Sequence, residues 1–152
     1  RVNENRLRTT GVELLAAYAF DRVDLSGDVA FQSSEFITPA QTLKHMENQP
    51  EVFGTVRGRM PFVFGTQISA NAEYTGRQYC LAPSGDEVTL AAGTRIGGDV
   101  SRQWNLPRAR AGSLLSRLET RIGIDNAADH ALYDQCGLPR PGRLARFQIR
   151  LF

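Results

Sequence analysis

The side chains with the most evident chemistry in this sequence are two cysteines and two histidines. Cys80 and Cys136 lack the close spacing of a zinc site, and a single pair is too small to define a disulfide framework. His45 precedes Met46, and these soft ligands, like His130, would suit the capture of copper or haem. Both histidines fall in expected loops, so we expect solvated side chains there, with no resident metal and no cofactor.

Catalytic machinery is not evident in the sequence. An activated nucleophile needs a neighbouring base and a third group that orients the base. No Gly-x-Ser-x-Gly segment or comparable nucleophile motif occurs. The sequence therefore predicts a protein that is not an enzyme.

Charge and hydropathy exclude two further classes. The net charge of +2 comes from 18 basic and 16 acidic side chains that are interspersed along the chain, so no nucleic-acid partner is expected. No apolar stretch approaches the roughly 20 residues of a membrane-spanning helix. A mean hydropathy of -0.30 suits either a soluble domain or a membrane barrel, whose strands alternate apolar and polar residues.

Alternation of apolar and polar residues with period 2 is the dominant pattern, and it indicates β-strands. It is cleanest over 66–80, where Ile68 and Tyr74 share one face and Asn71 lies on the other. The design recurs, more loosely toward the N-terminus, in 12–20, 25–32, 51–59, 94–106, 117–125 and 145–151. Arg102 is an exception, because it falls on the apolar side of its segment. The sequence predicts seven antiparallel strands.

The connections between these strands alternate in length. Those at 21–24, 60–61 and 107–112 are short, whereas those at 37–50, 81–93 and 127–143 are longer and rich in Pro, Gly, Asp and Asn. Short periplasmic turns and long extracellular loops are typical of outer-membrane barrels. Seven strands are one fewer than the smallest single-chain barrels have, so we expect a piece of a larger barrel.

A soluble antiparallel sandwich or lipocalin-like barrel that binds a small ligand inside would show the same alternation, with the apolar face buried. A complete small structural or adhesin barrel is a third possibility. The polar face carries closely placed charges of both signs, which suit a wide lumen as well as a solvated surface: Glu73, Arg77, Arg95, Asp99, Arg117, Glu119, Arg121 and Asp125. Aromatic residues near strand ends could be interfacial girdles or ordinary core residues: Tyr18, Phe20, Tyr74, Trp104, Phe147 and Phe152.

The segment 122–143 reads IGIDNAADHALYDQCGLPRPGR, and an alternating strand that ends at Phe152 follows it. It resembles the end of TonB-dependent outer-membrane receptors, where Asn-Leu-(Thr/Phe)-Asp-x-x-Tyr precedes Gly-x-Pro-x-Pro-Gly-Arg and the closing strand. The matching residues are Asn126, Asp129, Tyr133, Gly137, Pro139, Pro141, Gly142 and Arg143. Segment 5–13 also resembles the segment that opens a descending strand in this family, and 72–79 resembles a Tyr-x-Gly-x-x-Tyr strand end. Ala128 departs from the pattern, and Phe152 is out of phase with the strand that it ends.

The resemblance implies an antiparallel transmembrane β-barrel of about 22 strands in the outer membrane of a Gram-negative bacterium, with a plug in its lumen. Residues 1–152 would be the C-terminal portion of that barrel, without the plug domain and the N-terminal strands. Such receptors contact outer-membrane lipid and use energy supplied through TonB to take up scarce ligands. The resemblance favours a ferric siderophore, haem or cobalamin, and it names no ligand-binding residues.

Two residue roles follow from this hypothesis. In the family the terminal aromatic strand is recognised by the barrel-assembly machinery, so Phe152 would serve biogenesis rather than transport. Cys80 falls at the loop end of its strand and Cys136 in the last long loop, which places both on the same, oxidising side. This topology favours a disulfide between them over two unpaired thiols. The bond would tie the last loop to a neighbouring one.

Overall fold

The computed structural model describes residues 7–37, 45–106 and 116–152, and these residues form β-strands, turns and one short 3-10 helix. Seven strands make one antiparallel sheet, in which each strand pairs with the next large strand along the chain. In spatial order they are β1 (Leu7–Phe20), β2 (Val23–Phe36), β3 (Val52–Pro61), β4 (Thr66–Thr75), β7 (Gly93–Asn105), β8 (Arg117–Asp125) and β11 (Leu144–Leu151). The predicted all-β class and the seven antiparallel strands are confirmed.

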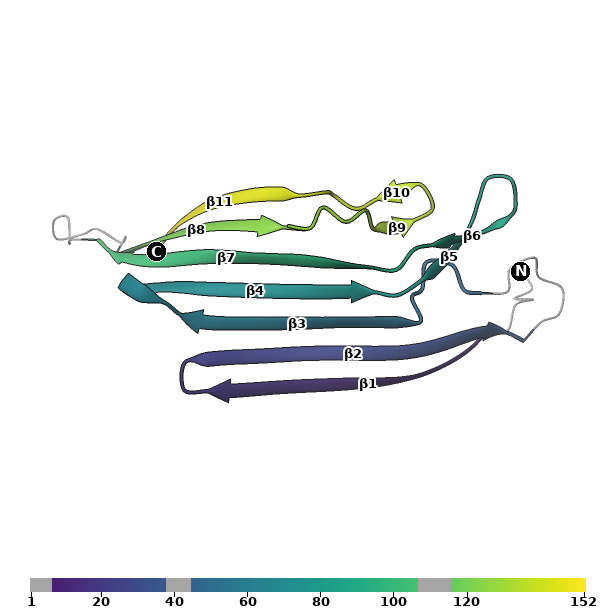
Figure 1. Cartoon of the computed structure of the whole chain (residues 1–152), viewed down its shortest axis with the longest axis horizontal. Helices are drawn as coiled ribbons and strands as arrows, with labels where there is room; N and C mark the ends of the chain where they lie inside the picture. Colours follow the sequence, from purple (N-terminus) through teal and green to yellow (C-terminus); the bar gives the residue numbers. More distant parts are fainter. Residues whose placement is uncertain (1–6, 38–44, 107–115) are drawn as a thin grey trace.

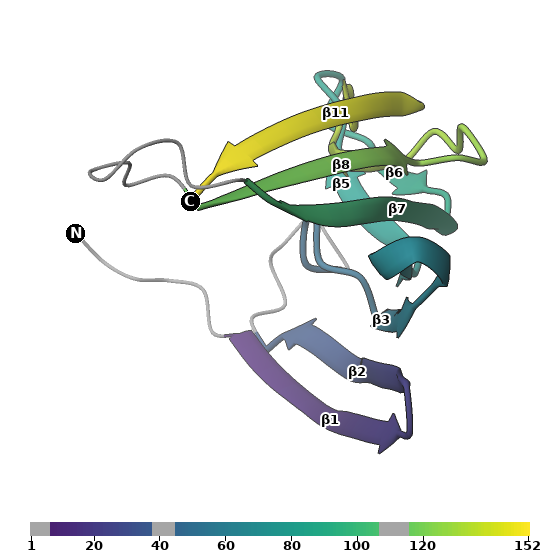
Figure 2. The ribbon, with the colours of Figure 1, turned by 90° about the vertical axis from the view of Figure 1, so that its left-hand side faces the viewer.

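The sheet is open, with β1 and β11 as its two edges. The strands lie lengthwise beside one another in Figure 1. Seen from the end, in Figure 2, they follow an arc from β1 and β2 through β3 to β11. The architecture is therefore a curved sheet that does not close on itself within the described residues.

Short and long connections lie at opposite ends of the sheet, as the sequence predicted (Figure 1). At the end that we call the turn end, residues 21–22 join β1 to β2, and a segment containing the 3-10 helix η1 (Val63–Gly65) joins β3 to β4. The expected short turn at 107–112 lies outside the described residues. The long connections lie at the opposite, loop end, and the first of them is described only from His45 onward.

Two of the long connections carry small hairpins of their own. In the first, β5 (Gln78–Leu81) pairs with β6 (Glu87–Leu90), and in the second, β9 (Tyr133–Gln135) pairs with β10 (Leu138–Pro139). The prediction of one strand over 66–80 is therefore wrong, because β4 ends at Thr75. Gly76 follows β4, and its N–H still donates to the carbonyl of Val52 at 2.7 Å, so close that a Cβ would clash with the same oxygen.

The register of the sheet places most of the large apolar residues of the seven strands on one face. Ile68 lies opposite Val100, Val100 opposite Ile122, and Ile122 opposite Phe147. Since side chains alternate along a strand, a slip of one residue in any pair would move that strand's apolar residues to the other face. The alternation seen in the sequence thus becomes two continuous surfaces, which we call the apolar face and the polar face.

The sheet has no hydrophobic core within the described residues. The buried hydrophobic side chains there are Cys80 and Leu132, and both belong to the loop end. No helix in the described part of the chain is long and apolar enough to cross a membrane. Burial of apolar area, usually the main driving force of folding, is therefore nearly missing from the sheet of the isolated chain.

Candidate functional site

The apolar face is exposed along the whole sheet. Ile122 is 64% exposed and Phe147 is 66% exposed. Large side chains from each of the remaining strands of the sheet contribute to the same surface. The exposed members include Val12, Leu14, Tyr18, Leu25, Phe31, Val56, Tyr74, Ile96, Val100, Ile124, Ile149 and Leu151. Ile68 is half-buried. A continuous apolar patch of this extent marks a surface that is covered by another molecule or by lipid.

The polar face is the better buried of the two. Ser101 and Glu119 are only 7% and 8% exposed, although one is polar and the other charged. Arg121 lies between two carboxylates, with its Nη2 3.1 Å from Glu119 and its Nε 3.7 Å from Asp99. Because charged residues are almost never buried unless they are paired, this face has the pattern of an interior.

Further charge pairs extend across the polar face from one edge strand nearly to the other. Arg59 of β3 reaches Asp24 of β2 at 3.1 Å, and Arg146 of β11 reaches Asp125 of β8 at 2.6 Å. β1 differs from the other strands, because its polar-face positions hold Leu15, 74% exposed, and small alanines. At Ser101, Asp99 and Glu119 of β7 and β8, the relation between polarity and burial is the reverse of that in a soluble domain.

The motif residues of the last long connection come together in space and shape it. Asn126 is 2% exposed, and its side chain accepts a hydrogen bond from the N–H of His130 at 3.1 Å and donates to the carbonyls of His130 and Pro141. Asp129 accepts from the N–H of Arg143 at 2.8 Å. The first and last parts of the motif are therefore joined by side-chain to backbone bonds.

The remaining motif residues lie at turns or on the surface. Gly137 has φ +71°, which favours glycine, at the turn between β9 and β10. A Cβ at Gly142 would lie 2.8 Å from a carboxylate oxygen of Asp129, so a side chain there would have to displace the carboxylate that accepts from the Arg143 N–H. Tyr133 and Pro139 are exposed strand residues of the small hairpin. The geometry gives the motif a role in building this loop.

A disulfide joins Cys80 to Cys136, the pair that the topology favoured. The two Cα atoms are 5.6 Å apart although the residues are 56 positions apart in sequence. The bond links the β5–β6 hairpin to the β9–β10 hairpin, and Cys80 is almost fully buried. The two longest described connections are thus one covalently linked cluster, which we call the loop cluster.

Arg140 ties the loop cluster to the sheet. Its guanidinium pairs with Asp134 in the cluster and with Glu73 of β4. Burial alone would lower the pKa of this guanidinium, but hydrogen bonds and charge interactions with Asp134 and Glu73 outweigh that effect and raise its pKa. Sequence reasoning missed this contact, because Glu73 and Arg140 are 67 residues apart and no local pattern links them.

Leu132 supplies the apolar part of the same anchor. It is 3% exposed, and a Cβ at Gly93 would lie 2.6 Å from its Cδ2 atom. The first residue of β7 therefore has no room for a side chain. A bulky residue at Gly93 would push Leu132 out of the cluster.

Phe152 follows the last residue of β11. Its N–H donates to the carbonyl of Arg117 at 2.9 Å, and its carbonyl accepts from the N–H groups of Ser116 and Arg117. Phe152 is 52% exposed. The backbone of the terminal residue is thus held against β8, while its ring remains accessible.

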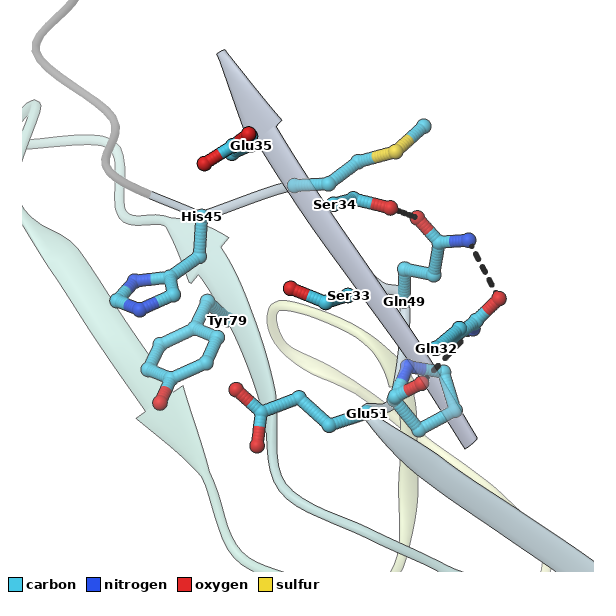
Figure 3. A pocket seen from close by; sticks show the side chains of 10 residues that line it. Gln32, Ser33, Ser34, Glu35, His45, Gln49, Glu51 and Tyr79 are labelled. Carbon is cyan, nitrogen blue, oxygen red and sulfur yellow. Dashed lines mark hydrogen bonds between the residues drawn. The ribbon is translucent and has the colours of Figure 1, made fainter. Parts of the chain in front are cut away.

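A small cavity of about 260 Å³ opens at the loop end beside β2 (Figure 3). On one side, the ring of His45 stacks on that of Tyr79, with the centroids 3.8 Å apart, and its Nδ1 lies 2.9 Å from a carboxylate oxygen of Glu87. The expectation of a freely solvated His45 is therefore wrong. His130 is exposed, with its Nδ1 3.1 Å from the carbonyl of Thr94.

Polar amides form the opposite side of this cavity. Gln49 donates to Gln32 at 2.9 Å and accepts from the hydroxyl of Ser34 at 3.1 Å, as the dashed lines in Figure 3 show. The carboxylates of Glu35 and Glu51 also lie on the lining. Within the described ranges no group of three or more His, Cys, Asp or Glu side chains could hold a metal ion. The cavity offers hydrogen bonds, one aromatic stack and an acidic rim.

No known protein-family model matches this sequence. The structural features that bear on function are the apolar and polar faces, the loop cluster and the loop-end cavity.

Proposed function

We propose that this chain forms part of the membrane-spanning wall of an outer-membrane β-barrel, in a receptor of the TonB-dependent type that takes up a ferric siderophore or a similar scarce iron complex. The single observation that carries the membrane part of the proposal is the inverted burial of the sheet. Large aliphatic and aromatic side chains are exposed, while Ser101, Glu119 and Asp99 on the other face are mostly covered. Hydrocarbon on one side and a polar lumen on the other would satisfy both faces.

Strand lengths agree with this proposal. The seven strands of the sheet have 8 to 14 residues, and a tilted strand needs about 9–11 residues to cross the hydrocarbon core. The short turns and the long, disulfide-linked loops then correspond to the periplasmic and extracellular sides.

The open edges require further strands. In lipid every backbone N–H and C=O group must be paired, because no water is present to replace a missing partner. The outer edges of β1 and β11 face no strand within the described residues. Additional strands, from the same or another polypeptide, would complete the barrel and enclose the polar face.

The receptor role itself rests on the resemblance of 122–143 to the end of these receptors and on the loop-end cavity. In a barrel of this orientation, a ligand arriving from outside the cell would meet the loop cluster and the stacked His45 and Tyr79 first. The selectivity for iron complexes is the most specific element of the proposal, and it needs a transport experiment.

Cysteine labelling in isolated outer membranes tests the membrane part. Phe147→Cys and Gln148→Cys are adjacent substitutions on opposite faces of β11. We expect Phe147→Cys to react with a lipid-soluble maleimide and Gln148→Cys with a water-soluble one. Equal reaction of both with the water-soluble reagent, or recovery of the protein as a monomer in detergent-free buffer, would overturn the proposal.

Growth under iron limitation tests the transport part. We expect deletion of the encoding reading frame to abolish growth on one ferric siderophore as sole iron source, while growth on excess ferrous iron stays normal. Unchanged growth and unchanged radioactive iron uptake with every siderophore, haem and cobalamin tested would refute the receptor role and leave the barrel itself intact.

A further inference from the structure

Arg102 is the one charged side chain on the apolar face, within the described residues, that has no carboxylate partner. It lies in β7, opposite Thr66 of β4 and Thr120 of β8, in the same row of positions as Val100 and Trp104. The other charges on this face, Arg8 and Glu35, sit at the loop end and approach each other at 3.9 Å. Arg102 thus interrupts an otherwise apolar surface near the turn end.

The surroundings of Arg102 hold its guanidinium in place without neutralising it. The Cζ atom lies 3.9 Å from the centre of the Trp104 ring, a cation–π contact that leaves the charge intact. The indole N–H of Trp104 donates to the hydroxyl of Thr120 at 3.1 Å. Since that hydroxyl accepts from the indole, its own proton can be donated to another group.

The sheet leaves no place for a carboxylate from a further strand. β4 and β8 already flank β7 on both sides, and the residues opposite Arg102 are threonines. The partner must therefore approach from the side that the apolar face presents to its surroundings. It must be an anion that is compatible with a largely apolar contact surface.

We propose that Arg102, Trp104 and Thr120 bind the phosphate group of a phospholipid in the periplasmic leaflet of the outer membrane. This inference rests on the proposed function, which makes the apolar face lipid-facing and the turn end periplasmic. The planar guanidinium matches phosphate oxygens in a two-bond arrangement, and the Thr120 hydroxyl adds a third donor. The acyl chains would lie along the neighbouring aliphatic side chains of the apolar face.

The depth of Arg102 suits a headgroup rather than the membrane interior. It precedes the last residue of β7, Asn105, by three positions, which is roughly 10 Å at about 3.3 Å per residue. The guanidinium lies over the ring of Trp104, nearer that end of the strand, so it is displaced toward the membrane surface. Tryptophan is enriched at the same level, where its ring is apolar and its N–H needs a polar partner.

Quenching of Trp104 fluorescence by brominated lipids tests the inference. Trp104 is the only tryptophan among the 152 residues, and subtracting the spectrum of Trp104→Phe isolates its emission. The full chain in maltoside micelles, which contain no phosphate, is titrated with brominated phosphatidylglycerol or with brominated diacylglycerol. We expect half-maximal quenching by the phospholipid to need roughly tenfold more lipid in Arg102→Gln. Quenching by diacylglycerol should be the same in both proteins.

Three controls define the source of the anion and the role of the charge. Arg102→Lys should recover part of the phospholipid preference, because it keeps the charge but not the two-bond geometry. Arg117→Gln, which removes an arginine from the polar face near the same end, should leave the preference unchanged. Inorganic phosphate at millimolar concentration should not compete; if it abolishes the preference, the site binds the free anion and the lipid assignment is wrong.

The two proposals fail in different ways. Equal quenching by both brominated lipids, unaffected by Arg102→Gln, would overturn the phosphate site while leaving the apolar face in contact with lipid. No quenching of Trp104 by either lipid would overturn the membrane assignment on which this inference depends.

Discussion

The sheet and the loop cluster are held together in opposite ways. In the sheet, large apolar side chains point outward and the described residues contain no core beneath them. In the loop cluster, a disulfide, the buried Leu132 and the buried Asn126 place the stabilising contacts inside the chain. The sheet therefore depends on its surroundings for stability, whereas the loop cluster carries its own. The effect of substitutions in the sheet on stability should therefore depend on lipid, and the effect of substitutions in the loop cluster should not.

The largest expected effect comes from placing a charge on the apolar face. Phe147→Arg in bilayers should lower the free energy of unfolding by about 2–4 kcal/mol, because an arginine at mid-strand would face hydrocarbon. Gln148→Arg, one residue away on the polar face, should change it little. Denaturant titration of the protein in vesicles measures both. Similar losses for the two variants would contradict the difference between the faces.

Removing the disulfide should loosen the loop cluster more than the sheet. A bridge that closes a loop of this length is worth about 2–4 kcal/mol. In Cys136→Ser we expect rapid proteolysis and fast hydrogen exchange within 126–143, with exchange in β7 and β8 nearly unchanged. Cys80→Ser should reproduce the result. If the sheet strands lose protection to the same degree as the loop, the cluster is not an independent unit.

Asn126→Ala should cost about 1–3 kcal/mol of local stability, because it removes the three hydrogen bonds that this buried side chain makes to the backbone of His130 and Pro141. Asn126 also adopts a left-handed φ of 48°, which alanine tolerates less well. Asn126→Asp keeps the acceptor for the His130 N–H but loses both donated bonds, so an intermediate loss is expected. Hydrogen exchange of the His130 amide reports the change, and equal exchange in all three proteins would speak against the assigned role.

The smallest effect is expected at the contact between cluster and sheet. Arg140→Gln should cost no more than about 1 kcal/mol, since the guanidinium is partly exposed and solvent screens its charge pairs. The loss should appear as faster opening of the loop cluster in hydrogen exchange, with the disulfide intact. Arg143→Gln, whose side chain is exposed, provides the comparison. A larger effect at Arg143 than at Arg140 would mean that the anchor is misassigned.

Strand number, strand pairing and the facing of side chains could be predicted from the sequence, because alternation with period 2 is a local signal. Ile68 and Tyr74 already indicate their common face when read alone. The pairing of Cys80 with Cys136 followed from counting strands. The end of β4 at Thr75 could not be predicted, because the alternation in the sequence continues past it to Cys80.

The parts of the candidate site that sequence reasoning missed all depend on contacts between distant segments. The stacking of His45 on Tyr79 joins two connections, and the pair of Arg140 with Glu73 joins a loop to a strand. No spacing rule links such residues before the topology is known. Arg102, by contrast, was visible as an exception in the alternation, and only the register with Thr66 and Thr120 showed what surrounds it.

The bond between Cys80 and Cys136 also closes a covalent ring of chain that contains the whole of β7 and β8. A mechanical pull on the two ends of the polypeptide would pass through the sulfur atoms and bypass these two strands. β1 to β4 and β11 could be peeled away one at a time, but the backbones of β7 and β8 would carry no tension between the two ends while the bond is intact. β7 and β8, which lie beside the edge strand β11, are thus the best protected part of the sheet against forced extraction.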